Sequence, residues 1–136
     1  FHLERFLLNL FFIIHSHPSR QVPAACPDWL RRAYTTIQCP EVLTGGVQAF
    51  KQACGRSAAH VSRACRQWLG ATPSQIVTRF RMDHAAKQLA MTDRSIVDIS
   101  MECGFDSLSH FYRLFKQRNG ISPNQYRVRN KFTAGS

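Results

Sequence analysis

Apolar residues recur at intervals of three and four along most of this chain, which is the period of an α-helix with one buried face. Near the start, this pattern predicts an amphipathic helix over residues 2–16, formed by Leu3, Phe6, Leu7, Leu10, Phe11 and Ile14. Three prolines then fall within 17–27, a composition typical of a linker. We therefore place a boundary at this stretch.

About seven more helices are predicted after the linker, from apolar periodicity and from residues that start or stop helices. Asp28 is expected to cap the first of them, and Thr44 the second, whose opening turn is weakened by Gly45 and Gly46. Gly55 is expected to end that second helix. The other five are expected at 57–70, 73–91, 95–103, 107–119 and 123–129. Because no window in this part alternates with the period of a strand, the predicted fold class is all-α.

Three segments are expected from this organisation. Residues 1–27 would be the last helix of a missing upstream domain with its linker, 28–131 a helical domain, and 132–136 a tail. Phe1 is not a translational start, so we expect the chain to be a piece of a longer protein. For the apolar helix 2–16, a homodimer surface is the alternative to packing on an upstream domain.

An internal repeat organises residues 47–129. Sliding 57–79 onto 107–129 gives eight identities in 23 positions, and the shorter element upstream repeats at a lag of 49 residues. The matched pairs include Ser57/Ser107, His60/His110, Arg63/Arg113, Gly70/Gly120, Pro73/Pro123, Arg79/Arg129 and Gly55/Gly104. Each copy is a short helix, a glycine turn and a longer basic helix. This order is that of a helix-turn-helix unit, in which the second helix enters the major groove of DNA.

The periodicity of the two basic helices predicts which side chains face outward. Placing the apolar stripe of each helix on the core leaves an outer stripe, where arginine can read guanine with two donors. The expected base-reading residues are Ala59, Ser62, Arg63 and Arg66 in the first copy and Ser109, Tyr112, Arg113 and Lys116 in the second. The expected phosphate contacts are Ser57, His60, Arg79, Ser107, His110 and Arg129.

Charge supports a nucleic-acid partner. The 18 Lys and Arg residues against 8 Asp and Glu give a net charge of +10. The basic residues are concentrated in 56–81 and 107–131, which contain no acid, whereas 82–106 is acidic. Double-stranded DNA is therefore the leading partner, and a non-specific nucleic-acid-binding protein or a helical protein-interaction module is the alternative.

Enzymatic, metal-binding and membrane functions find little support. There is no nucleophile elbow, zinc-protease motif or phosphate-binding loop, so no catalytic residue is predicted, although a Cys/His dyad stays as a formal alternative. Five cysteines without a C-x-x-C pair predict neither a disulfide framework nor a metal site, and no cofactor is expected. They favour a reducing compartment, hence a cytoplasmic location. The apolar run 6–14 is too short to span a bilayer.

Three segments carry a resemblance to a known family. Residues 96–105 (IVDISMECGF), 107–116 (SLSHFYRLFK) and 120–127 (GISPNQYR) resemble the C-terminal signature of the AraC/XylS family of bacterial transcription regulators. Residues 81–89 (RMDHAAKQL) are similar to the helix that links the two helix-turn-helix units of that family. The resemblance extends over about 28–129. It implies two DNA-binding units with recognition helices at 57–69 and 107–119, in a transcription regulator of the activator type.

The resemblance also implies partners. A ligand-sensing domain would precede the DNA-binding domain, and RNA polymerase would be contacted. The spacing of the apolar helix, the linker and residues 27–30 (PDWL) is similar to regulators of chitobiose or cellobiose operons, which implies a sugar-like effector bound by the missing domain. Two departures concern the first unit. Ala59 and Ser62 are smaller than the family's usual base-reading side chains, and Gly45-Gly46 is a weaker helix opening.

Overall fold

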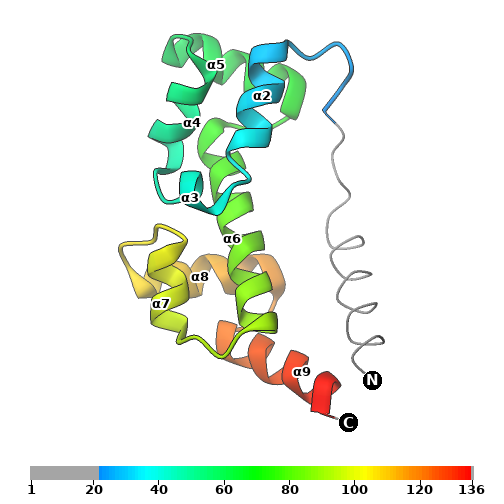
Figure 1. Cartoon of the computed structure of the whole chain (residues 1–136), viewed down its shortest axis with the longest axis vertical. Coiled ribbons are helices and arrows are strands. Elements are labelled where there is room, and N and C mark those ends of the chain that lie inside the picture. Colours follow the sequence, from blue (N-terminus) through cyan, green and yellow to red (C-terminus); the bar gives the residue numbers. More distant parts are fainter. Residues whose placement is uncertain (1–21, 136) are drawn as a thin grey trace.

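A computed structural model describes residues 22–135, and every regular element in this part of the chain is helical (Figure 1). The predicted helix 2–16 lies outside the described residues. The elements are α2 (Asp28–Thr36), α3 (Pro40–Leu43), α4 (Gly46–Cys54), α5 (Ala58–Ala64), a π-helical turn (Cys65–Leu69), α6 (Pro73–Met91), α7 (Ile96–Glu102), α8 (Leu108–Asn119) and α9 (Pro123–Gly135). The all-α prediction is confirmed.

Helix α6 runs through two lobes, each with its own hydrophobic core. In Figure 1, α2 to α5 surround its first half and α7 to α9 its second half. Ile76 and Val77 of α6 pack in the first core, which extends from Cys26 to Val77. Met82, Ala85 and Leu89 of the same helix pack in the second core, which extends to Tyr126. Helix α6 therefore contributes buried side chains to the cores of both lobes.

Side-chain caps fix where α5, α6, α7 and α8 begin. The hydroxyls of Ser57 and Ser107 accept the backbone N–H three residues later at 3.3 Å each. Thr72 and Gln75 form a reciprocal capping box at the start of α6. The repeat reproduces this box at α9, where Ser122 and Gln125 exchange the same two bonds at 3.0 and 3.2 Å. The similarity of the two copies therefore extends to hydrogen bonds.

Several predicted boundaries are wrong. Asp28 is the first residue of α2 rather than its cap, and Pro27 precedes it without a side-chain cap. Thr44 does not cap α4; its hydroxyl donates to the carbonyl of Glu102, 3.1 Å away in the other lobe. The cap of α4 is Gly45, followed by Gly46 in the left-handed region at φ +64°. Glycine alone adopts that conformation at no steric cost, so the double glycine permits the sharp turn of the backbone at the start of α4.

The remaining differences concern helix lengths. The four-residue helix α3 was not predicted, and it begins with proline at its first position. The basic helix predicted over 57–70 is α-helical only to Ala64, and its last turn is π-helical. The last helix continues to Gly135, beyond the predicted end at Arg129 and into the expected tail at 132–136.

Candidate nucleic-acid interface

Two helix-turn-helix units are present, one in each lobe. In the first, α4 ends at Gly55, which has φ +64° and connects to α5. In the second, α7 is followed by Gly104 at φ +91°, which leads to α8. The left-handed conformation at both turns requires glycine, so the Gly55/Gly104 match in the repeat has a structural cause.

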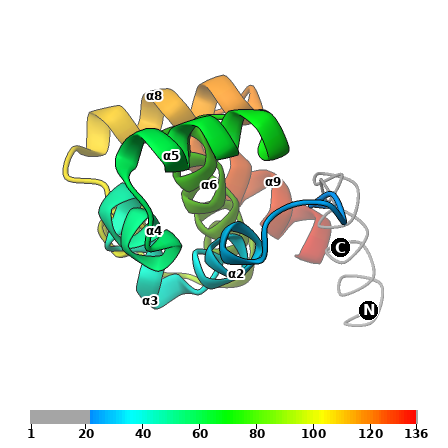
Figure 2. The ribbon, with the colours of Figure 1, turned by 90° about the horizontal axis from the view of Figure 1, so that it is seen from above.

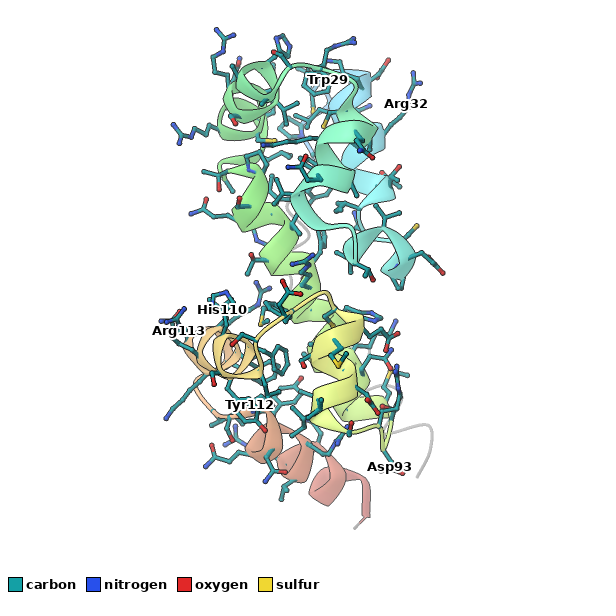
Figure 3. The ribbon with its side chains drawn as sticks, turned by 90° about the vertical axis from the view of Figure 1, so that its left-hand side faces the viewer. Trp29, Arg32, Asp93, His110, Tyr112 and Arg113 are labelled. Atoms are coloured by element: carbon teal, nitrogen blue, oxygen red, sulfur yellow. The ribbon has the colours of Figure 1, made fainter. Side chains whose placement is uncertain are left out.

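The second helices of the two units lie on the same side of the molecule. Viewed along its long axis, α5 and α8 both cross the same face of α6 (Figure 2). The perpendicular view in Figure 3 also places both along one edge, α5 in the upper lobe and α8 in the lower. The molecule thus presents two basic helices, one above the other, to a single partner surface.

Of the four residues predicted for the outer stripe of α5, three are exposed. Ala59, Arg63 and Arg66 are exposed and Ser62 is half-buried. The opposite side of the helix is closed by the buried residues Val61, Ala64 and Cys65. Because the π-helical turn begins at Cys65, Arg66 is rotated away from the strict α-helical stripe of the other three. The first unit therefore offers Arg63 as its large side chain in line with Ala59.

On α8, three of the four predicted residues are exposed. These are Ser109, Arg113 and Lys116. Tyr112 is half-buried: it packs against the second core, with its ring 6.2 Å from that of Phe111 in an edge-on contact. Figure 3 shows His110 and Arg113 together at the outer edge of α8, with Tyr112 further toward α9. Only part of the Tyr112 ring is accessible to a partner.

The two matched histidines pack on aromatic rings at the start of each basic helix. The His60 ring lies 5.3 Å from Trp29, and the His110 ring lies 6.1 Å from Phe105. Trp29 also carries the guanidinium of Arg56, 5.5 Å from its ring centre. The sequence analysis missed Arg56 and Trp29 as part of this surface. Arg56 belongs to the basic block 56–81, which was the available signal.

The predicted phosphate contacts occupy three kinds of position. Ser57 and Ser107 cap their helices, and His60 and His110 are exposed one turn later. Arg79 is half-buried in an open groove of about 730 Å³ between α6 and α8. The groove is lined by Gly70, Ala71, Ser74, Gln75, Thr78, Arg79, Met82, His110, Leu114, Gln117 and Arg118. Arg129 is exposed on α9.

Three acids of the segment 82–106 can be placed relative to the basic face. Asp83 pairs with Arg118 of α8, and Glu102 pairs with Arg94. Figure 3 shows Asp93 on the side of the molecule opposite Arg113. The acids of 82–106 named here are therefore either paired with arginine or turned away from α5 and α8.

Three buried cysteines of the described part are poor candidates for chemistry. Burial raises the pKa of the Cys54 thiol to about 11, that of Cys65 to about 12 and that of Cys103 to about 11. A thiol that stays protonated is a weak nucleophile and a weak metal ligand. Within residues 22–135 no three His, Cys, Asp or Glu side chains come together as a metal site would need, and no helix there is long and apolar enough to cross a membrane.

Two helix-turn-helix units on one connecting helix, with both basic helices exposed on one face, define a double helix-turn-helix DNA-binding domain. A family model described as a helix-turn-helix domain matches residues 51–129, more than half of the chain. The chain belongs to this family, and its matched relatives include AraC-type transcription regulators.

Solved structures and curated relatives agree with this assignment. The C-terminal domain of AraT, a response regulator from Geobacillus stearothermophilus, has a TM-score of 0.68 at 30% identity, covering 77% of this chain and 88% of that one. An AraC-type regulator from Chromobacterium violaceum has a TM-score of 0.67 at 26% identity, covering 75% of this chain and 91% of that one.

The curated relatives are longer proteins. The transcriptional activator RhaS of Yersinia pestis is 34% identical over 101 residues, which are 74% of this chain and 34% of RhaS. The uncharacterised regulator YisR of Bacillus subtilis is 41% identical over 68 residues, 50% of this chain and 24% of YisR. The chain thus spans about a quarter to a third of the length of these relatives.

Proposed function

We propose that this chain recognises a specific duplex DNA sequence as a monomer, with α5 in one major groove and α8 in the next. The observation that carries the proposal is the placement of both basic helices on one side of α6. Helix α6 has 19 residues, which at 1.5 Å each span roughly 28 Å. Successive major grooves on one side of B-DNA are about 34 Å apart, so a connecting helix of this length is of the right order to place α5 and α8 in neighbouring grooves.

Within this arrangement, Arg63 and Arg113 are the main base readers. Each is exposed at the same place of its helix, and a bidentate arginine contact to guanine contributes about 1–3 kcal/mol of discrimination. Ser109 and Lys116 extend the reading surface of α8, and Tyr112 contributes the accessible part of its ring. Ala59 and Ser62 offer small side chains for apolar or hydroxyl contacts. Arg66 lies beyond the strict stripe and contacts bases or the backbone at its edge.

Phosphates flanking these grooves are bound at the helix starts and in the groove between the units. Ser57 and Ser107 cap helix N-termini, where the helix dipole attracts anions. His60 and His110 follow one turn later, and Arg79 and Arg129 occupy equivalent places after each basic helix. These six residues hold the register on DNA and carry no sequence information themselves.

The two elements of the target differ from each other. The copies follow one another along the chain, so no two-fold axis relates them, and their outer stripes carry different residues. We infer a non-palindromic target with two elements about 10 base pairs apart. The small side chains of the first unit favour a weaker first element. Non-specific nucleic-acid binding by the whole domain is the second candidate function.

The remaining parts of the proposal concern the whole protein. Because the matched segment makes up 24% of YisR and 34% of RhaS, we infer a separate domain upstream of it. We propose that this domain binds a sugar-like effector, as in regulators of the chitobiose or cellobiose type, and that it or residues 2–16 form a homodimer. Two relatives, RhaS and RhaR, are named as activators, which supports an activating role. Contact with RNA polymerase and a cytoplasmic location are inferred from the family resemblance. No catalytic activity or cofactor is proposed.

Selection of bound duplexes from a random-sequence library by the purified chain tests the proposal. We expect one enriched motif with two unlike elements, centred about 10 base pairs apart. Enrichment without a shared motif would support the non-specific alternative, and a palindrome would contradict the monomeric arrangement.

A further inference from the structure

The two lobes meet at a small cluster of residues around Arg81. Arg81 lies on α6 between Val77, which packs in the first core, and Met82, which packs in the second. Its Nε donates to the carbonyl of Leu43 at 3.0 Å, and its Nη2 donates to the carbonyl of Thr44 at 3.4 Å. These are the last carbonyls of α3 and its cap, so Arg81 closes the end of a helix in the first lobe.

The same guanidinium also contacts the second lobe. It lies 5.6 Å from the ring centre of Phe105, a residue of the second core. A Cβ added at Gly104, in the turn between α7 and α8, would lie 2.6 Å from Nη2 of Arg81, and a Cβ added at Gly46 would lie equally close. The guanidinium therefore fills the space between the entry turn of α4 and the turn that leads into α8.

A second bond crosses the same junction. The hydroxyl of Thr44 donates to the carbonyl of Glu102 at 3.1 Å, which joins the end of α3 to the end of α7. Two different types of contact therefore hold α3 and α4 against the α7–α8 turn, in addition to the continuous helix α6.

We propose that Arg81 is a positioning residue that holds the two helix-turn-helix units in one relative orientation and thereby sets the spacing of the two DNA elements that the chain accepts. The part that concerns DNA spacing rests on the proposed function. A helix alone permits bending and twisting between two lobes, whereas a guanidinium bonded to one lobe and packed on the other restricts them. Restricting them in advance removes an entropic cost of binding both elements at once.

Arg127 provides a matched control. It lies on α9 and donates to the carbonyls of Leu89 and Thr92 at 3.4 and 3.3 Å, at the end of α6. It is half-buried, as Arg81 is. Arg127 therefore closes a helix end in the same way, but all its bonds stay next to the second core.

The test compares the wild-type chain with Arg81→Ala, Arg81→Lys and Arg127→Ala in two measurements. Residual dipolar couplings of backbone amides, measured without DNA, give the relative orientation of the lobes. Affinities are measured for a duplex selected by the wild-type chain, for versions with spacing changed by about one or two base pairs, and for versions with one element scrambled.

For Arg81→Ala we expect couplings that no longer fit the wild-type orientation, and a loss of at least about tenfold on the original duplex. The preference for the original spacing should flatten, while affinity for a single element changes by less than about twofold. Arg81→Lys keeps the charge but loses the planar guanidinium that reaches both lobes, so it should shift both readouts in the same direction even if Arg81→Ala fails to fold. Arg127→Ala should keep the wild-type orientation and spacing preference.

The proposal is overturned if the Arg81 variants retain the wild-type couplings, if they retain the sharp spacing preference, or if Arg127→Ala changes both as strongly. If selection enriches no duplex, the proposed DNA recognition fails, and the couplings alone decide whether Arg81 fixes the orientation of the lobes.

Discussion

The guanidinium of Arg113 donates a hydrogen bond to Nδ1 of His110, 2.8 Å away and one turn earlier on α8. Both side chains are exposed, and Figure 3 shows them together at the outer edge of the helix. The bond limits the rotamers of Arg113 before any partner is bound, which lowers the entropic cost of a directed contact. In the first copy, His60 packs on Trp29 at the corresponding place.

Replacing Arg63 or Arg113 by alanine should weaken binding to the selected duplex by about 1–3 kcal/mol and relax the preference at one position in it. Arg79→Ala should instead weaken all duplexes alike, because a phosphate contact carries no sequence information. Titrations of specific and random duplexes separate these effects.

Arg32 provides the matched control for the loss of charge. It is exposed on α2, on the side of the molecule opposite α5 and α8 in Figure 3. Arg32→Ala should leave both affinities nearly unchanged. If Arg63→Ala lowered specific and random binding equally, Arg63 would be a phosphate contact rather than a base reader.

The affinity for DNA should depend steeply on salt. With about six to ten phosphate contacts, affinity falls by roughly three to five orders of magnitude between 50 and 200 mM salt through release of counterions. Titrations at four or more salt concentrations give the slope. A flat response would contradict a basic interface of two helices.

The cap role and the phosphate role of Ser107 can be separated by substitution. Ser107→Ala should reduce the free energy of unfolding by about 0.5–2 kcal/mol, because the backbone N–H of His110 loses its acceptor. Ser107→Asp should keep that stability, because aspartate is also a good cap. It should nevertheless weaken DNA binding, since it places a negative charge beside the phosphate. Urea unfolding and DNA titration of both variants check this. If Ser107→Asp kept the full affinity for DNA, no phosphate would be bound at Ser107.

The stability of the fold should fall at acidic pH because of His84. Its Nε2 is buried without a hydrogen-bond partner in the described part of the chain, 3.8 Å from Oε1 of Glu102. Burial, with smaller effects of Lys87 and Arg94, holds the pKa of His84 below its ordinary value of 6.5. Below pH 6.5 the unfolded chain therefore binds a proton that the folded chain takes up less readily, so the free energy of unfolding decreases as the pH falls.

His84→Gln removes this group, and urea unfolding at ~pH 7.5 and ~pH 5.5 measures the difference. The variant should lose less stability than the wild type between these two values. An unchanged loss in His84→Gln would assign the acid sensitivity to other groups.

The sequence predicted the elements whose signals are local. The starts of α5, α6 and α8 lie within one residue of the predicted starts, and the hydroxyls of Ser57, Thr72 and Ser107 cap them. A hydroxyl three residues before a free backbone N–H is a short-range arrangement. The exposed stripe of α5 followed from periodicity alone. The recurrence of the pattern after 50 residues made the second unit predictable from the first.

What the sequence missed depends on contacts between distant residues. Thr44 was predicted as a cap, but its hydroxyl donates a hydrogen bond to the carbonyl of Glu102, 58 residues later. No local signal predicted the π-helical turn at Cys65–Leu69, and Tyr112 packs against the second core although it falls on the outer stripe. In the sequence, Arg81 is only one arginine of the basic block 56–81. Its contacts at the junction could not be predicted, because its partners come from 43–46 and 104–105.

The central claim is that α5 and α8 bind one face of the same duplex at the same time. Inserting about five base pairs between the two selected elements turns the second major groove to the far side of the duplex. We predict that the affinity of the wild-type chain then falls to that of a duplex with one element scrambled. Unchanged affinity would contradict the claim: only one helix-turn-helix unit would engage DNA, and the small Ala59 and Ser62 make the first unit the idle one.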